Sequence, residues 1–150
     1  MVRVTKLTDY GIALMTCLAK GRPSEQFTAQ ELSKAMRLPL PTVRKILKTM
    51  TRAGLLESTR GANGGYGLAR TPEEISLLDM VAAMEGPLAM TECSATEDCR
   101  CSLEKICGLK KNWSWINQQL KSTLKGYNLA QMAGSLADEP IPARRDQGFR

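Results

Sequence analysis

Hydrophobic residues recur at helical spacing in the first part of the chain. In TDYGIALMTCLAKG a Thr-Asp pair precedes the apolar positions and a glycine follows them, which predicts a helix over residues 8–21 with an inner face of Ile12, Met15, Leu18 and Ala19. Further on, Thr28-Ala-Gln-Glu31 fits a capping box that opens a short helix over 31–36. Pro39 follows, so this second helix is expected to end in a tight turn.

A third amphipathic segment covers residues 41–54 and begins with a proline, which suits the first position of a helix. Its apolar face consists of Val43, Ile46, Leu47 and Met50. Its opposite face is polar and basic, and consists of Thr42, Arg44, Lys45, Lys48 and Arg52. A short helix, a turn and a second helix with a basic face are typical of a helix-turn-helix, whose second helix can enter the DNA major groove. The residues of the basic face are therefore candidate DNA contacts.

Two short segments with strand character follow, LLESTR and YGLAR, and the turn GANGG joins them. A helix-turn-helix followed by a basic hairpin predicts a winged helix, which is mainly α with a small β-hairpin. Arg60 and Asn63 lie where such a hairpin could reach phosphate or the minor groove. The glycines of the turn are compatible with close approach to DNA, and equally with turn geometry alone.

The second half of the chain predicts two more helices. Thr71-Pro-Glu-Glu74 fits another capping box and predicts a helix over 72–85, ended by Gly86-Pro87. Later an apolar residue recurs every three or four positions, which places one stripe on a long helix over 109–133: Leu109, Trp113, Ile116, Leu120, Leu124 and Tyr127. Because only a small domain is available to cover this stripe, we expect it to form the seam of a homodimer.

The distribution of charge divides the chain at about the same positions as the predicted helices and hairpin do. Residues 1–70 carry 12 Lys and Arg against 4 Asp and Glu, residues 71–108 carry 2 against 8, and residues 109–150 carry 7 against 3. The basic first part, 1–70, is a candidate for binding a polyanion such as double-stranded DNA. We therefore expect a DNA-binding domain over 1–70 and a connecting helix, cysteine segment and dimerisation helix over 71–133. The remainder, 134–150, is rich in Pro, Gly and charge and predicts a disordered tail.

Apolar runs in this chain are short and interrupted by charge, and the N-terminus lacks the apolar region of a signal peptide. We therefore expect a cytoplasmic protein that does not enter a membrane. An enzyme is not indicated, because the chain has no histidine and no nucleotide-binding glycine motif in a strand-to-helix setting. No small-molecule substrate is expected.

Four of the five cysteines fall within CSATEDCRCSLEKIC, as Cys93, Cys99, Cys101 and Cys107. Cytoplasmic thiols are mostly reduced, so such a dense group favours metal binding or redox chemistry over structural disulfides. The intervals of five, one and five residues lack the C-x2-C pairs of a zinc site and suit an iron-sulfur cluster better. A zinc-stabilised dimer and direct sensing of oxidants by the thiols remain alternatives. The fifth cysteine, Cys17, falls in the first predicted helix as a small apolar residue.

Three stretches together, TDYGIALMTCLA, TVRKILKTMTRAGLLESTRGANGGYGLAR and CSLEKICGLKKNW, resemble the bacterial iron-sulfur transcription regulators typified by IscR, NsrR and RirA. The last stretch most resembles the branch that regulates SUF cluster-assembly operons, and the likeness covers about residues 1–133. The resemblance implies a homodimeric winged-helix protein that binds operator DNA. It also implies an iron-sulfur cluster, [2Fe-2S] or [4Fe-4S], and control of genes for cluster assembly, iron supply or oxidative stress, most simply as a repressor.

The resemblance further implies three cysteine ligands and a fourth ligand that differs among members. Cys93, Cys101 and Cys107 match best, because C-S-L-E-x-x-C is the register that leads into the tryptophan-containing helix. Cys99 departs from the pattern and could itself be the fourth ligand. Asp9 in TDYG is the other candidate, since the nitric-oxide-sensing branch takes a carboxylate from that position. A role as helix N-cap would explain Asp9 without any cofactor.

Overall fold

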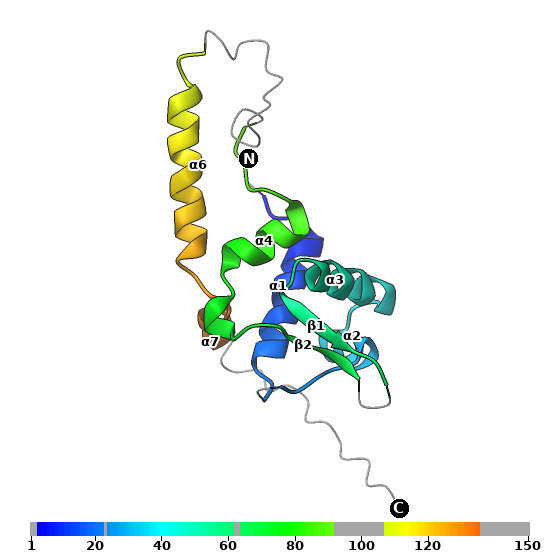
Figure 1. The fold of residues 1–150 in the computed structure, drawn as a ribbon. Coiled ribbons are helices and arrows are strands. Elements are labelled where there is room, and N and C mark those ends of the chain that lie inside the picture. The colour runs from blue at the N-terminus through cyan, green and yellow to red at the C-terminus, as the bar shows by residue number, and fades with distance from the viewer. Residues whose placement is uncertain (1–2, 23, 62–63, 92–106, 136–150) are drawn as a thin grey trace, which may run out of the picture.

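The computed structural model describes residues 3–22, 24–61, 64–91 and 107–135 of the chain. The predicted winged helix is confirmed: three helices lead into an antiparallel hairpin, and further helices follow it (Figure 1). In chain order the elements are α1 (Lys6–Ala19), α2 (Ala29–Met36), α3 (Leu40–Arg52), β1 (Leu56–Thr59), β2 (Gly65–Leu68), the 3-10 turn η1 (Pro72–Glu74), α4 (Leu77–Glu85), α6 (Lys110–Lys125) and α7 (Leu129–Ser135). None of the helices in these described ranges is both long enough and apolar enough to span a bilayer.

The helix-turn-helix forms at the predicted capping box. The Thr28 hydroxyl accepts a hydrogen bond from the Glu31 N–H at 3.2 Å, and the Glu31 carboxylate accepts one from the Thr28 N–H at 2.8 Å. These bonds satisfy N–H groups that have no partner within the helix itself. α2 ends at Met36, and its C-cap Arg37 has a left-handed backbone at φ +52°. α3 then begins at Leu40, one residue before the predicted start at Pro41. Pro41 therefore occupies the second position of the helix and not the first.

One hydrophobic core unites the hairpin with α1, α2, α3, α4 and α7. The predicted inner face of α3 is confirmed, because all four of its apolar side chains are fully buried: Val43, Ile46, Leu47 and Met50. In α1, Met15 and Leu18 are buried as predicted, whereas Ile12 and Ala19 are partly buried against the core. Fully burying one such large apolar side chain contributes about 1.5–3 kcal/mol. The buried apolar face of α3 therefore fixes which side of the helix faces solvent.

The start of α1 differs from the prediction. Its N-cap is Thr5, whose hydroxyl accepts a hydrogen bond from the Thr8 N–H at 3.3 Å, so the helix begins at Lys6. The predicted start at Thr8 or Asp9 is wrong, because the earlier threonine already caps the helix. Asp9 lies in the first turn and is exposed, so the N-cap interpretation of its carboxylate is wrong as well. At that position it interacts favourably with the positive end of the helix dipole.

A single continuous helix over 72–85 does not form. The capping box at Thr71 closes only the 3-10 turn η1, and Ile75 then adopts an extended conformation at φ −98° and ψ 110°. Ile75 is fully buried, and its carbonyl accepts a hydrogen bond from the Leu129 N–H of α7 at 2.8 Å. A second capping box, between Ser76 and Asp79, begins α4. The extended conformation at Ile75 is favoured over a continuous helix because it buries the Ile75 side chain and pairs its carbonyl with α7.

The predicted helix over 109–133 is also interrupted. α6 ends at Lys125 with Gly126 as its C-cap, and α7 begins after Asn128, which exchanges two hydrogen bonds of 2.9 Å with Gln131. α7 contacts α1 and η1, and Leu129 is fully buried there. The C-terminal part of the predicted helix therefore belongs to the core of the same chain.

α6 stands apart from the winged helix and contacts α4 (Figure 1). Much of its apolar stripe remains open to solvent, since Leu109 is 58% and Ile116 38% exposed, and Tyr127, just beyond the helix, is 52% exposed. The other members of the stripe, Trp113, Leu120 and Leu124, are partly buried. Trp115, which the predicted stripe omits, is 64% exposed. Within the described residues this stripe is not a core, and the homodimer seam stays a prediction, now limited to α6.

Candidate nucleic-acid interface and cluster site

α3 presents a basic surface because its opposite side is anchored in the core. Arg44, Lys45, Lys48 and Arg52 are exposed, and Thr42 is partly buried. No acidic residue occurs in this helix, and within the described ranges none of the four cations forms an ion pair. Cations that have no partner in the protein can bind phosphate without first breaking an internal contact. The structure therefore places the five predicted α3 residues together on one helix with its cations available for DNA.

The hairpin lies next to α3 and is held from both sides. β1 pairs with β2 in a register that sets Leu56 opposite Leu68, and β1 contacts α3. Tyr66 of β2 also exchanges two backbone hydrogen bonds, of 2.8 and 3.0 Å, with Phe27, which lies just before the cap of α2. Arg60 is exposed directly after β1, whereas Asn63 lies outside the described residues. The wing and the helix-turn-helix are therefore one mechanical unit.

Packing inside the wing accounts for two of its glycines. A Cβ on Gly65 would lie 2.8 Å from the backbone oxygen of Phe27, and a Cβ on Gly64 would lie 2.2 Å from that of Thr59. Both neighbours are backbone atoms, which cannot move aside without breaking the hairpin. Steric crowding against the backbone therefore explains why these two positions lack a side chain.

The first turn of α1 is tied to the last residue of α4. Glu85 accepts hydrogen bonds from the Thr8 hydroxyl and from the Thr5 N–H, the latter at 3.0 Å. The Thr8 hydrogen bond, supported by those from Thr5, holds the pKa of the Glu85 carboxyl below its ordinary value. Gly86, at φ +87°, ends α4 directly afterwards, and the cysteine-bearing segment begins a few residues on. The Glu85 carboxylate therefore joins the start of α1, which carries Asp9, to the helix end from which the chain leads to the cysteines.

The stabilisation from Glu85 is expected to depend on pH. Because the folded-state pKa is lowered, the stabilisation is present above the pKa of the unfolded chain and is lost as pH falls through the folded-state pKa. Glu85→Gln is expected to lower the free energy of unfolding near neutral pH by less than about 1 kcal/mol, because the carboxylate is solvent-screened. The difference from wild type should shrink in thermal melts recorded down to about pH 3. Glu73→Gln, at an exposed carboxylate of η1, is the control, and an equal effect there would contradict the assignment.

Two of the predicted cluster ligands lie within the described residues. Cys107 is partly buried just before α6, and its carbonyl accepts a hydrogen bond from the Lys110 N–H at 3.5 Å. Asp9 is exposed on α1. Cys93, Cys99 and Cys101 lie outside the described residues. In the described ranges no three His, Cys, Asp or Glu side chains gather as a metal site would require.

Cys17, the cysteine outside the predicted cluster segment, lies on α1. It is partly buried and packs against the hydrophobic core, as the sequence predicted. Burial raises the pKa of its thiol, with Lys20 acting in the opposite direction. A raised pKa reduces the fraction of thiolate, which is the reactive and metal-binding form. Cys17 is therefore a structural residue.

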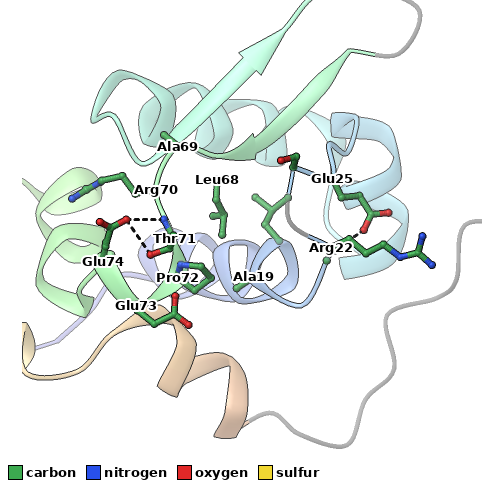
Figure 2. A pocket seen from close by; sticks show the side chains of 13 residues that line it. Ala19, Arg22, Glu25, Leu68, Ala69, Arg70, Thr71, Pro72, Glu73 and Glu74 are labelled. Atoms are coloured by element: carbon green, nitrogen blue, oxygen red, sulfur yellow. Dashed lines mark hydrogen bonds between the residues drawn. The ribbon is translucent and has the colours of Figure 1, made fainter.

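A cavity of ≈ 660 Å³, which no motif in the sequence indicated, opens between the end of α1, β2 and η1 (Figure 2). Its apolar lining includes Leu68 and Pro72. The carboxylate of Glu74 accepts hydrogen bonds from the N–H and hydroxyl of Thr71, both at 3.0 Å, and these bonds lower its pKa. Glu25 similarly accepts the Arg22 N–H at 2.8 Å. The Glu74 carboxylate caps η1, the Glu25 carboxylate bonds within its own loop, and none of the predicted DNA or cluster residues lines the cavity.

A basic helix backed by a buried apolar face, a tight turn before it and a hairpin beside it define a winged helix-turn-helix DNA-binding protein. The Rrf2 family model, described as an iron-dependent transcriptional regulator, matches residues 4–135. The chain belongs to the Rrf2 family, whose members are transcriptional regulators and not enzymes. The resemblance to the IscR, NsrR and RirA type of regulator is therefore confirmed.

Individual relatives agree with this assignment. The chain is 34% identical over 149 residues to Protein aau3 of Rhizobium meliloti (strain 1021), covering 99% of this chain and 90% of the relative. It is 30% identical over 109 residues to the HTH-type transcriptional regulator NsrR of Shouchella clausii (strain KSM-K16), covering 73% of each.

Solved structures show the same fold. CymR, the global cysteine regulator of B. subtilis, superimposes with a TM-score of 0.70 at 26% identity and covers 90% of this chain and 98% of its own. IscR of T. potens superimposes with a TM-score of 0.66 at 25% identity and covers 93% of each chain.

Proposed function

We propose that this regulator is a homodimeric repressor whose affinity for operator DNA depends on an iron-sulfur cluster. The observation that carries the proposal is how the cysteine-bearing segment is attached. On one side the chain leaves α4, whose last residue, Glu85, is bonded to the first turn of α1, and on the other it returns through Cys107 into α6. A change in ligation there would reach both the DNA-binding helices and the exposed apolar helix.

DNA binding would use the basic face of α3. In this proposal α3 lies in the major groove, with Thr42, Arg44 and Lys45 near base edges and Lys48 and Arg52 on phosphates. Arg60 and Asn63 of the wing would contact the adjacent backbone or minor groove. A twofold dimer would place two such helices about 34 Å apart, in successive major grooves.

The residues available fit an iron-sulfur cluster by their chemistry. Four cysteines and no histidine form an all-thiol donor set, and thiolates are the usual ligands of such clusters. Cys93, Cys101 and Cys107 would hold the iron, with Cys99 or Asp9 as the fourth ligand. Asp9 is exposed on the turn that Glu85 holds, so its carboxylate is accessible for that role. When bound, the group would supply sensitivity to iron supply and oxidants.

Coupling between the two sites has a direct route through packed helices. α4 contacts α1 and α3, and α6 contacts α4, so a shift at either end of the cysteine segment reaches the recognition helix. Coupling between two sites is typically about 1–3 kcal/mol, which changes affinity by about 5- to 150-fold. The proposed cluster therefore needs to bias α4 only modestly to control operator binding.

A second copy of the chain is the proposed occupant of the α6 surface. Leu109 and Ile116 lie on one face of this helix, with Tyr127 just beyond its end, and all three are exposed apolar side chains; Trp115 is a further exposed apolar side chain off that face. Such a face on an otherwise polar helix is typical of helix pairing. The seam would then be α6 alone and not the whole of 109–133, because α7 packs on α1.

Anaerobic purification of the full chain tests the proposal. We expect a brown protein with matched iron and acid-labile sulfide that is a dimer by light scattering. It should enrich a defined duplex from a random DNA pool and bind that duplex about 5- to 150-fold differently once iron has been removed. A protein that stays colourless after reconstitution with iron and sulfide would overturn the cluster, and one that selects no duplex would overturn DNA binding.

Direct thiol sensing is the second candidate function. The similarity to CymR, described as a global cysteine regulator, favours it. It predicts a colourless protein that binds DNA without iron, loses binding when an oxidant forms disulfides, and recovers binding in excess thiol. A colourless protein that contains stoichiometric zinc would instead favour a zinc-stabilised dimer.

A further inference from the structure

The turn between α2 and α3 carries an arginine where the backbone favours glycine. Arg37 has φ +52° and ψ +37°, in the left-handed region that L-residues other than Gly, Asn and Asp rarely adopt. Two other helices are followed by a glycine with positive φ, Gly54 at φ +73° after α3 and Gly86 at φ +87° after α4, although the ψ of Gly86, −169°, differs from that of Arg37. The chain therefore uses glycine at those turns but keeps a long cationic side chain at this one.

Hydrogen bonds hold this turn in place. The Leu38 N–H donates to the Ser33 carbonyl at 3.1 Å, and the Ser33 hydroxyl donates to the Leu38 carbonyl at 2.6 Å. The Arg37 N–H donates to the Lys34 carbonyl at 3.4 Å. This is the pattern in which a left-handed residue ends a helix. With glycine at position 37 all three hydrogen bonds would still form, because none of them uses the Arg37 side chain. The arginine side chain is thus not needed to form the turn.

Nothing else in the described fold uses the Arg37 side chain. It is exposed, and within the described ranges its guanidinium makes no hydrogen bond or ion pair. Lys34, in the last turn of α2, and Arg44 of α3 are exposed as well, so exposed cations precede and follow Arg37 along the chain. A strained residue whose side chain does not stabilise the fold indicates a function for that side chain.

We propose that Arg37 binds a phosphate of the operator backbone beside the recognition helix. This inference rests on the proposed DNA binding and adds a residue that the helical pattern of the sequence did not select. An arginine in the turn before α3 would fix the register of that helix on the duplex, since phosphate contacts position a protein and base contacts specify the sequence. Its rigid fork of N–H donors suits phosphate.

Arg37→Gly distinguishes a role in forming the turn from a role in binding phosphate. Glycine relieves the strain of the left-handed backbone, and the substitution removes the cation. We expect a melting temperature equal to or above that of wild type, together with affinity lowered by about 10-fold. The plot of log affinity against log salt should become shallower by about 0.9 for each phosphate that is no longer neutralised, or about 2 for a dimer. The decrease should be similar for selected and random duplexes, and Arg37→Lys should restore most of the affinity. Arg22→Ala, an exposed arginine at the cavity of Figure 2, is the control for charge alone.

The outcomes distinguish this inference from the proposed function. Wild-type protein that binds DNA while Arg37→Gly binds with the same affinity and salt dependence would overturn the role of Arg37 only. Wild type that binds no duplex would overturn both. If Arg37→Gly loses its fold, Arg37→Asn supplies the same test, because asparagine also tolerates the left-handed conformation.

Discussion

The double variant Arg44→Glu/Lys48→Glu is expected to bind operator DNA at least about 100-fold more weakly than wild type while unfolding at nearly the same temperature. Both side chains are exposed on α3, and within the described residues neither has an ionic partner to lose. In a dimer the change removes four cations from the DNA surface and places four anions against phosphate. The salt dependence should also become less steep, by about 0.9 for each phosphate that the variant no longer neutralises.

Fluorescence anisotropy with the selected duplex, at several salt concentrations, measures this effect. The matched control is Lys111→Glu/Lys125→Glu, which changes the net charge equally at two exposed positions of α6. We expect the control variant to lose only the small part of its DNA affinity that depends on the net charge of the protein. Equal decreases in affinity in both variants would mean that total charge and not the α3 face governs binding, and unchanged binding in the α3 variant would remove α3 from the interface.

Where local pattern and tertiary packing agree, the sequence was sufficient to predict this fold. The apolar face of α3 followed from helical spacing alone, and the Thr28–Glu31 capping box of α2 was identified from its residue types, since both signals lie within a few residues. α2 itself begins at Ala29, two residues before the predicted start at 31. The same spacing placed the basic face correctly, because burial of one side of a helix leaves the other in solvent.

Departures from the predictions arose where distant segments decide the backbone. Ile75 is extended because its carbonyl pairs with Leu129, and no local signal between the capping box and Glu85 reveals that partner. The bond from Thr8 to Glu85 likewise joins residues 77 positions apart. At Gly126 the apolar stripe continues in the sequence, but the following helix, α7, packs on α1 and does not extend α6. Spacing alone cannot distinguish these choices.

For the candidate sites, the sequence indicated which types of residue could bind a cluster or DNA better than it indicated where those residues lie in the fold. Thiol content and the absence of histidine narrow the donor set, yet the contribution of Asp9 depends on the first turn of α1, which the prediction began too late. Arg37 went unnoticed because helical spacing assigns no face to a turn residue. Its signal is the left-handed backbone, which only the structure provides.

Cys101→Ala is expected to abolish the brown colour of the anaerobically purified protein, whereas Cys17→Ala is expected to keep it. Removing one thiolate from a set of three cysteines leaves too few ligands to retain the iron. Cys17 packs against the core with a raised pKa, so its thiol is not expected to bind iron. Visible absorbance, iron and sulfide content, and operator affinity should change together in Cys101→Ala, with affinity moving to the value of iron-depleted wild type. Full iron content in Cys101→Ala would remove this residue from the ligand set.

A partial decrease in iron in Cys99→Ala but not in Asp9→Ala would identify Cys99 as the fourth ligand, and the reverse would identify Asp9.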